Sequence, residues 1–533
     1  MYEGGLRRYK SIYNFENNGR FVSNILLMFS HFLISIQNLQ TYFSNLILVI
    51  ILVVPLFSIF IIFITATFGK RYIYLLALYS TLISFLLSFY LWYIYNSTVG
   101  GFQFTCALSV LSTLPFSIRF GVDGFSLFFV LLTNIFIYLS ILSLNIKTVR
   151  LKEVILHLLF LQWTVLASFL FLDILGFFLF FEMTLIPIYF LVLVWGSRER
   201  RIRASYLISI YTLLGSIFMF FNILYIISKT GTTDYEILLD VLFTEEDQKF
   251  LWLTFFISFA AKIPLFPLHI WLPEAHVEAP TLGSVLLAVL LLKLGTYGII
   301  RFSLPLFAIG TLFFGPLAST FAVIGVIYTC LTAIRQIDLK KIIAYSSVGH
   351  MNVVLLGILS GTSEGIQGAI FQMLSHGVVS GALFFAVGVI YERYSVRSLK
   401  YFGGLTFFYP IFSIIFLIFS MANISFPLTS SFVGEFLIFM GLFQQSFWST
   451  FFASTSMVLG AVYTLWTYNR IFFGNIRNLF LISYKDLNRK ELYLFLLLIF
   501  LLFFMGIFSY LILDTFLFDS ISLLEHCKCV RTL

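Results

Sequence analysis

The sequence predicts an all-α polytopic membrane protein of about fourteen transmembrane helices. The chain of 533 residues is 60% hydrophobic and only 11% charged, far from the balance of soluble domains. Its mean hydropathy is +1.01. Apolar runs long enough to cross a bilayer, about 20 residues each, recur along nearly the whole chain. Since backbone polar groups in lipid must be satisfied within the segment, a helical bundle is expected.

The apolar runs place the expected spans in chain order. Residues 44–533 form a single expected transmembrane domain, preceded by a leader over 1–43 whose stretch 21–39 fits either an extra span or an interfacial helix. The leader lacks a signal-peptide cleavage pattern and is expected to be retained. The expected spans are 44–68, 72–95, 123–145, 154–172, 174–196, 204–228, 251–271, 282–302, 305–330, 342–361, 366–391, 408–444, 449–471 and, as a C-terminal helix, 492–517.

Lysine and arginine are distributed unevenly between the two sets of loops. Loops after odd-numbered spans hold 20 of the 32 Lys and Arg residues, and loops after even-numbered spans hold four. The loop 229–250 is acidic. Positive loops stay in the compartment of synthesis, so the odd-numbered loops are expected there. The net charge of +8 is thus mostly an orientation signal, and no nucleic-acid partner is expected.

The cysteines argue against a redox centre on this chain. They are Cys106, Cys330, Cys527 and Cys529, and only the last two are close, as C-K-C. This pattern does not match an iron–sulfur or zinc site. No glycine-rich nucleotide loop follows a strand pattern. Neither a metal nor a cofactor is therefore expected here.

Four charged residues lie inside apolar spans: Glu182, Lys262, Lys293 and Glu435. A charge at the bilayer centre costs about 2.5–3.5 kcal/mol or more, so it is rarely kept without a partner or a water-filled path. A fixed ion pair that orients helices is a serious competing interpretation for any one of them. Three of the four lie in segments interrupted by proline or glycine, which favours a functional role.

These residue types suit a proton relay. Burial and neighbouring charges move the proton affinity of lysine and glutamate, whereas arginine stays protonated. Neutral histidine accepts a proton on one nitrogen while donating from the other, so His269, His350 and His376 are candidate links. Taken singly, each histidine is as well explained by packing.

The alternation of Glu274, His276 and Glu278 in LPEAHVEAPT raises the question of a metal site. Its spacing matches no metalloenzyme signature, so a loop contact is expected instead.

Two spans are interrupted by prolines, AAKIPLFPLHIWLP in the seventh and NISFPLTSSFVGEF in the twelfth. Proline removes a backbone hydrogen bond and clashes with the preceding turn, so both helices should unwind locally. The two breaks lie five spans apart and run in opposite directions. This predicts two inverted five-helix repeats, spans 4–8 (about 154–302) and 9–13 (about 305–471).

Several stretches resemble one family. GVDGFSLFFVLLT, FEMTLIPIYFLVLVWG, AKIPLFPLHIWLPEAHVEAPTLGSVLLAVLLLKLGTYGIIRF, IAYSSVGHMN, FQMLSHGVVSGALFFAVGVIYER and SFVGEFLIF are similar to the antiporter-like, proton-pumping membrane subunits of NADH:ubiquinone oxidoreductase (respiratory complex I), in particular the chain 4 family. The resemblance covers roughly residues 115–475. It does not extend in detail to the leader, the first two spans or the acidic loop.

The resemblance implies roles for the buried residues. Glu182, Lys262, Lys293 and Glu435 fall on the proton-relay positions of the family, and His269, His350 and His376 on its polar axis. The sister chains 2 and 5 have lysine where Glu435 stands, and chain 5 continues into a long lateral helix for which the tail after residue 517 leaves no room.

The family context carries further implications. Expected partners are other membrane-arm subunits, including chains 2 and 5, and membrane lipids. NADH, flavin, iron–sulfur clusters and ubiquinone are expected on other subunits. The expected location is the mitochondrial inner membrane, with odd-numbered loops toward the matrix.

Two alternatives stay open. A subunit of a multisubunit sodium/proton antiporter or of a membrane-bound hydrogenase would share the Glu and Lys motifs. A passive scaffold, in which the buried charges only fix helix packing, is the alternative from another class.

Overall fold

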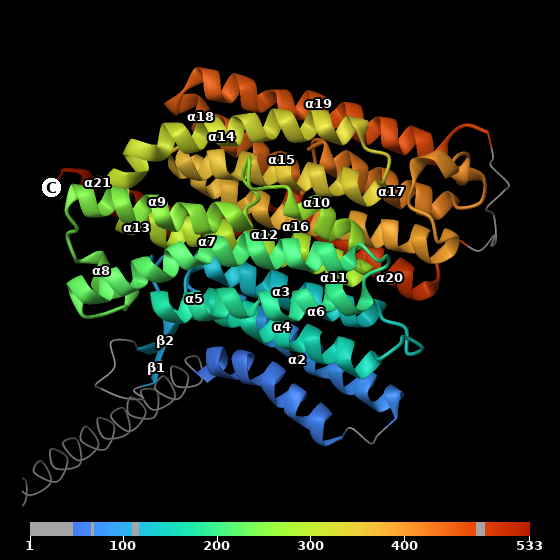
Figure 1. Ribbon diagram of the computed structural model, residues 1–533, viewed down its shortest axis with the longest axis horizontal. Coiled ribbons are helices and arrows are strands. Elements are labelled where there is room, and N and C mark those ends of the chain that lie inside the picture. Colours follow the sequence, from blue (N-terminus) through green and yellow to red (C-terminus); the bar gives the residue numbers. More distant parts are fainter. Residues whose placement is uncertain (1–45, 66–68, 109–116, 476–485, 533) are drawn as a thin grey trace, which may run out of the picture.

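The computed structural model describes residues 46–65, 69–108, 117–475 and 486–532. Most helices lie side by side with roughly parallel axes (Figure 1). Within these ranges, eleven helices are long and apolar enough to cross a membrane. The prediction of a polytopic helical membrane protein is confirmed. The leader 1–43 lies outside the described residues.

The helices follow one another with short connections, and most match the expected spans. The first part contains Leu46–Ile64, α2 (Lys70–Ile94), α3 (Gly124–Ser143), α4 (Leu151–Leu170), α5 (Ile174–Met183), α6 (Leu185–Trp195), α7 (Arg201–Thr230), α8 (Tyr235–Leu239), α9 (Glu245–Lys262) and α10 (Trp271–Glu278). The next part contains α11 (Thr281–Leu286), η1 (Leu287–Leu291), α12 (Leu292–Gly298), η2 (Ile299–Ser303), α13 (Leu304–Leu306), α14 (Ala308–Arg335), α15 (Leu339–Leu359) and α16 (Ser363–Tyr394). The last part contains η3 (Leu399–Tyr401), η4 (Leu405–Phe407), α17 (Pro410–Asn423), α18 (Ser430–Gln445), α19 (Phe447–Phe472), α20 (Arg489–Ile507) and α21 (Ser509–Thr532).

Two long segments form the core of the bundle. Over their most apolar stretches, Thr281–Leu306 and Ser363–Tyr394 are completely buried by the surrounding helices. Lys293 and His376 lie on these two segments. The side chains of Lys293 and His376 therefore face other helices of the protein rather than lipid, and these helices can supply hydrogen-bond partners.

The seventh expected span is broken, as its prolines predict. α9 ends at Lys262 and α10 begins at Trp271, with Pro264 and Pro267 between them. The break frees backbone groups that need partners. The indole Nε1 of Trp271 supplies one by donating to the Ala261 carbonyl at 2.9 Å. The interruption is thus held by a specific contact.

The twelfth expected span is broken in the same way. α17 ends at Asn423 and α18 begins at Ser430. Ser425 and Leu428, between them, have positive φ angles of 65° and 75°, so the chain turns sharply there. The hydroxyl of Ser431 donates to the Ala422 carbonyl across the break. Both interrupted spans therefore close their gap with a side-chain donor.

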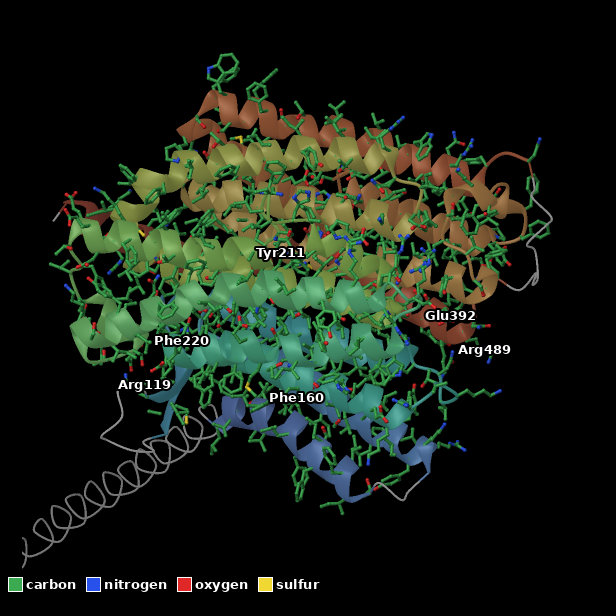
Figure 2. All side chains as sticks on the ribbon, in the orientation of Figure 1. Arg119, Phe160, Tyr211, Phe220, Glu392 and Arg489 are labelled. Atoms are coloured by element: carbon green, nitrogen blue, oxygen red, sulfur yellow. The ribbon has the colours of Figure 1, made fainter. Side chains whose placement is uncertain are left out.

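The chain is not entirely helical, which corrects the all-α prediction. Strands β1 (Gln103–Leu108) and β2 (Ile118–Val122) pair antiparallel before α3. They lie with α8 at one end of the bundle, called here the hairpin end, where Figure 2 labels Arg119. Glu392 and Arg489 lie at the opposite end (Figure 2).

The C-terminal helix also differs from its prediction over 492–517. It divides into α20 and α21 at Phe508, and α21 reaches Thr532. Hydropathy falls after residue 517, but a helix at the end of a bundle does not need a continuous apolar run. Gly506, a weak helix former, packs at the end of α20, where an added Cβ would lie 2.2 Å from the Leu428 carbonyl oxygen.

Candidate functional site: a buried row of charges

Lys262 is the last residue of α9 and is almost completely buried. The carbonyl end of a helix carries partial negative charge and stabilises a cation there. The Nζ of Lys262 donates to the backbone carbonyl of Phe181 at 2.5 Å and lies 3.1 Å from the centre of the Phe181 ring. The ammonium is therefore held by a carbonyl and an aromatic face.

Glu182, the residue after Phe181, interacts electrostatically with Lys262. Neither carboxylate oxygen of Glu182 makes a hydrogen bond of good geometry among the described residues, although the Ser216 hydroxyl lies close enough to interact with the carboxylate. Buried carboxylates are normally satisfied, so such a group calls for water or a change of geometry. The structure brings these two predicted residues close together without an intimate ion pair.

Lys293 occupies the centre of the bundle and is completely buried. The π-helical turn η1 precedes it and widens the helix, a feature common at functional sites. Its Nζ donates to the Ala288 carbonyl at 2.5 Å and lies 2.9 Å from Nδ1 of His376. A protonated Lys293 donates to Nδ1, which requires a neutral His376 to carry its own proton on Nε2.

His376 leads on to His350 and Glu435. The ring centres of His376 and His350 are 5.7 Å apart. His350 Nδ1 lies 2.9 Å from Oε1 of Glu435, and its Nε2 lies 3.2 Å from Oδ1 of Asn423. Gln372 donates to the same Glu435 oxygen at 3.1 Å. Lys293, His376, His350 and Glu435 therefore form one row of neighbouring ionisable groups, in which His350 is partly exposed.

The helices that carry the two lysines touch at their backbones. Gly295, two residues after Lys293, would place a Cβ 3.0 Å from the Phe259 carbonyl oxygen and 2.8 Å from a side-chain carbon of Ile263. Ile263 directly follows Lys262. A larger residue would separate α12 from α9. The glycine therefore sets the distance between the helix that carries Lys293 and the helix that carries Lys262.

We call Glu182, Lys262, Lys293, His376, His350 and Glu435 the charged axis. His269, the remaining predicted residue, lies in the break after Lys262 and packs against other rings. Its ring centre is 5.6 Å from that of Phe266 and 5.5 Å from that of Tyr328. Its Nδ1 has no partner among the described residues. The structure places it beside the axis rather than in contact with it.

Sequence reasoning missed several polar residues of the site. Gln372 was detectable, because it precedes His376 by one helical turn and shares its face. Asn423 was hidden at the start of a proline-containing break. Lys340 was taken as a loop charge, but it is buried and donates to the Ala279 carbonyl at 2.7 Å. Counting charges in loops does not show which of them fold back into the bundle.

The loop contact expected for Glu274, His276 and Glu278 was only partly right. All three lie in helix α10. Glu274 pairs with Lys341 at 3.0 Å, whereas His276 is buried and stacks on Phe384 with ring centres 4.6 Å apart. Among the described residues, no group of three or more His, Cys, Asp or Glu side chains is arranged to hold a metal ion.

Comparison with known proteins relates this geometry to a family. The family described as "NADH:quinone oxidoreductase/Mrp antiporter, TM" matches residues 172–460, which include all six axis residues. NADH-ubiquinone oxidoreductase chain 4 of Marchantia polymorpha is 46% identical over 92% of this chain and 99% of its own length. The Arabidopsis thaliana protein of the same name is 48% identical over 86% of this chain and 93% of its own length.

Solved structures agree with these relatives. A chain of respiratory complex I from Thermus thermophilus with bound NADH has a TM-score of 0.81 and 29% identity, covering 91% of this chain and 99% of that chain. A chain of the Mrp complex from Dietzia sp. DQ12-45-1b has a TM-score of 0.79 at 18% identity, covering 92% and 99%, and supports the fold alone. The chain therefore belongs to the NADH:quinone oxidoreductase/Mrp antiporter family of membrane subunits and, within it, to the NADH-ubiquinone oxidoreductase chain 4 group.

Proposed function

We propose that this chain is a proton-translocating subunit in the membrane arm of NADH:ubiquinone oxidoreductase and that the charged axis carries the protons. The observation that carries the proposal is the row of neighbouring ionisable groups from Lys293 through His376 and His350 to Glu435. Each of these groups gains and loses protons, and a packed scaffold gains no stability from so many buried ionisable groups.

The central step uses the two nitrogens of His376. Lys293 gives a proton to Nδ1, and the imidazolium then releases the proton held on Nε2. Nε2 is buried and has no hydrogen-bond partner among the described residues. His350 receives the proton and shares it with Glu435 at 2.9 Å. The amides of Gln372 and Asn423 orient these groups but do not titrate.

The first half of the axis acts on the second through charge. Bringing Glu182 to Lys262 stabilises the ammonium, and withdrawing it favours release of a proton. Gly295 holds the two lysine-bearing helices in contact, so a change of charge at Lys262 is felt at Lys293.

The wider architecture follows the same proposal. Spans 4–8 and 9–13 form inverted repeats in a set of about fourteen spans, with Lys262 and Glu435 on corresponding broken helices. The subunit lies in the mitochondrial inner membrane with its odd-numbered loops toward the matrix. Chains 2 and 5 are its proposed partners. NADH, flavin, iron–sulfur clusters and ubiquinone belong to other subunits.

Two variants test the relay. Lys262→Met keeps the length of the side chain, and Glu182→Gln keeps the shape of the carboxyl group. In membrane vesicles containing the assembled complex, each should lower NADH-driven proton pumping at least about tenfold, since a positioned acid or base contributes about 10²–10⁴-fold. Lys249→Gln is the matched control, because Lys249 lies on the same helix, is partly exposed, and contacts Glu245 and the Phe313 ring rather than an axis residue.

The outcomes separate the proposal from its alternatives. Parental pumping and proton-to-electron ratio in assembled Lys262→Met complex would establish a passive scaffold. Pumping of sodium in exchange for protons, independent of NADH, would establish the antiporter function instead. Failure to assemble decides nothing about the relay, so assembly is measured first and Glu182→Gln serves as the milder variant.

A further inference from the structure

A buried arginine lies between the charged axis and the hairpin end. Arg301, in η2, is only 8% exposed. Its guanidinium pairs with Oδ2 of Asp123, the N-cap residue of α3, at 2.6 Å. The rings of Phe102, Tyr297 and Tyr235 surround it, with centres at 4.7, 5.3 and 5.6 Å. Neither the relay nor loop orientation explains a cation held this tightly.

The arginine is connected to the central lysine along one helical segment. Lys293, Tyr297 and Arg301 follow at intervals of four residues and are all buried. Nε of Arg301 donates to the Tyr297 hydroxyl at 3.1 Å, and that hydroxyl donates to the Phe169 carbonyl at 3.2 Å. A proton leaving Lys293 toward the hairpin end would follow this face of the segment and meet Arg301.

The surroundings fix the arginine in place. The carboxylate of Asp519, on α21, accepts from the backbone nitrogens of Gly124 at 2.6 Å and Gly101 at 2.8 Å, and from the Tyr95 hydroxyl at 3.2 Å. These contacts tie α21 to the start of α3, where Asp123 lies. The Asp519 carboxylate thereby encloses the Arg301–Asp123 ion pair on the hairpin side. Because Asp519 already accepts three hydrogen bonds, it does not compete with Asp123 for the guanidinium.

We propose that Arg301, fixed by Asp123, is an electrostatic seal that keeps protons from passing between Lys293 and the hairpin end of the bundle. Arginine does not release its proton in proteins, so it cannot act as a relay. A fixed positive charge raises the energy of a second positive charge nearby, as in channels that use arginine to exclude protons. The seal rests on the proposed relay, because it protects the central lysine of that relay from back-leak.

The test measures passive proton leak without NADH. The double variant Arg301→Gln with Asp123→Asn removes both charges together, which avoids an unpaired buried carboxylate. Purified complex is reconstituted into liposomes, a pH gradient is imposed, and its decay is followed with a trapped dye. Leak per complex should rise by at most about tenfold: Coulomb's law gives that factor for a unit charge removed at about 10 Å with an effective dielectric constant of about 20, and removing the negative charge of Asp123 as well offsets part of it.

Two further variants make the result specific. Arg301→Lys keeps the charge, but lysine can release its proton, so its leak should lie between those of the parent and the double variant. Arg119→Gln changes an arginine at the same end that pairs with Asp234 at 2.9 Å, and it should stay as tight as the parent. Parental leak in the assembled double variant, or a leak in Arg301→Lys as large as in the double variant, would overturn the seal.

The readout is independent of the relay test. Loss of the relay lowers NADH-driven pumping without raising passive leak, as expected for Lys262→Met. Loss of the seal raises passive leak while electron transfer from NADH continues. If the relay variants pump normally but the double variant still leaks, the proposed function is wrong and the electrostatic seal at Arg301 is supported.

Discussion

Buried charges in this protein are held by partners of two kinds. Lys262 and Lys293 bond backbone carbonyls, which stay in place whatever the charge of the amine. Glu435 is bonded by His350 and Gln372, so one of its two neighbours is an ionisable imidazole and the other a neutral amide. The amide of Gln372 holds the Glu435 carboxylate in position without accepting the proton that the carboxylate exchanges. Gln372 is therefore a positioning residue.

Replacing Gln372 by leucine tests that role. The change removes one hydrogen bond to a charged group, worth about 1.5–3 kcal/mol, so proton pumping should fall roughly tenfold in assembled complex. Gln367→Leu is the control, because Gln367 lies on the same helix and bonds Ser520 rather than Glu435. Equal pumping rates for Gln372→Leu and Gln367→Leu would contradict the assignment. So would a parental pumping rate in Gln372→Leu.

At the scale of elements, glycines set the distances between helices that carry the axis. An added Cβ at Gly368 of α16 would lie 2.7 Å from the backbone nitrogen of Ile438 and 3.0 Å from the Gly434 carbonyl oxygen, both on α18. Backbone atoms cannot swing aside as a flexible side chain does, so the helices must move apart. Gln372 and Glu435 lie on these two helices.

Gly368→Ala should therefore weaken both stability and function. Overpacking costs about 1–3 kcal/mol, and the forced separation stretches the bonds to Glu435. The thermal midpoint of the assembled complex should fall by several degrees, with a parallel loss of pumping. Gly315→Ala, on α14, meets no atom within 4 Å of its added Cβ and should leave both unchanged or raise stability slightly. A Gly368→Ala complex as stable as Gly315→Ala would refute this role for the contact.

At the scale of the molecule, α21 closes the hairpin end through Asp519. This helix is not among the candidate membrane spans of the described residues. Burial first, and then the nearby charge of Asp123, raises the pKa of Asp519 to about 6 from an ordinary value of 3.8. The folded state thus binds this proton more tightly than the unfolded state does. The contribution of Asp519 to the free energy of unfolding therefore falls as the pH rises from about 4 to about 6, and it is constant above that.

Asp519→Asn should remove this pH dependence. The amide stays neutral, so the loss of thermal stability between pH 4 and pH 7 should be smaller in the variant complex than in the parent. Asp514→Asn, at an exposed position on the same helix, should retain the parental dependence. The same slope in all three proteins would show that Asp519 does not titrate in this range.

Proline and charge made much of this arrangement predictable. Prolines marked the breaks after Lys262 and Asn423, and the cost of burying charge singled out the two glutamates and two lysines of the axis. The partners were not predictable, because local sequence does not encode contacts such as Lys293 with His376, 83 positions away. The β1–β2 pair was missed for the same reason, since its pairing is set by the packing of the hairpin end.

The charged axis holds two glutamates and two lysines. With each in its ordinary ionised form and the histidines neutral, the four charges cancel. An extra proton anywhere along the row leaves a net charge inside a medium of low polarisability, which is costly. Uptake at one end is then favoured only together with release at the other. Electroneutrality alone thus couples the uptake of one proton by the axis to the release of another. The positive charge of each proton taken up lowers the affinity of the axis for the proton that it already holds.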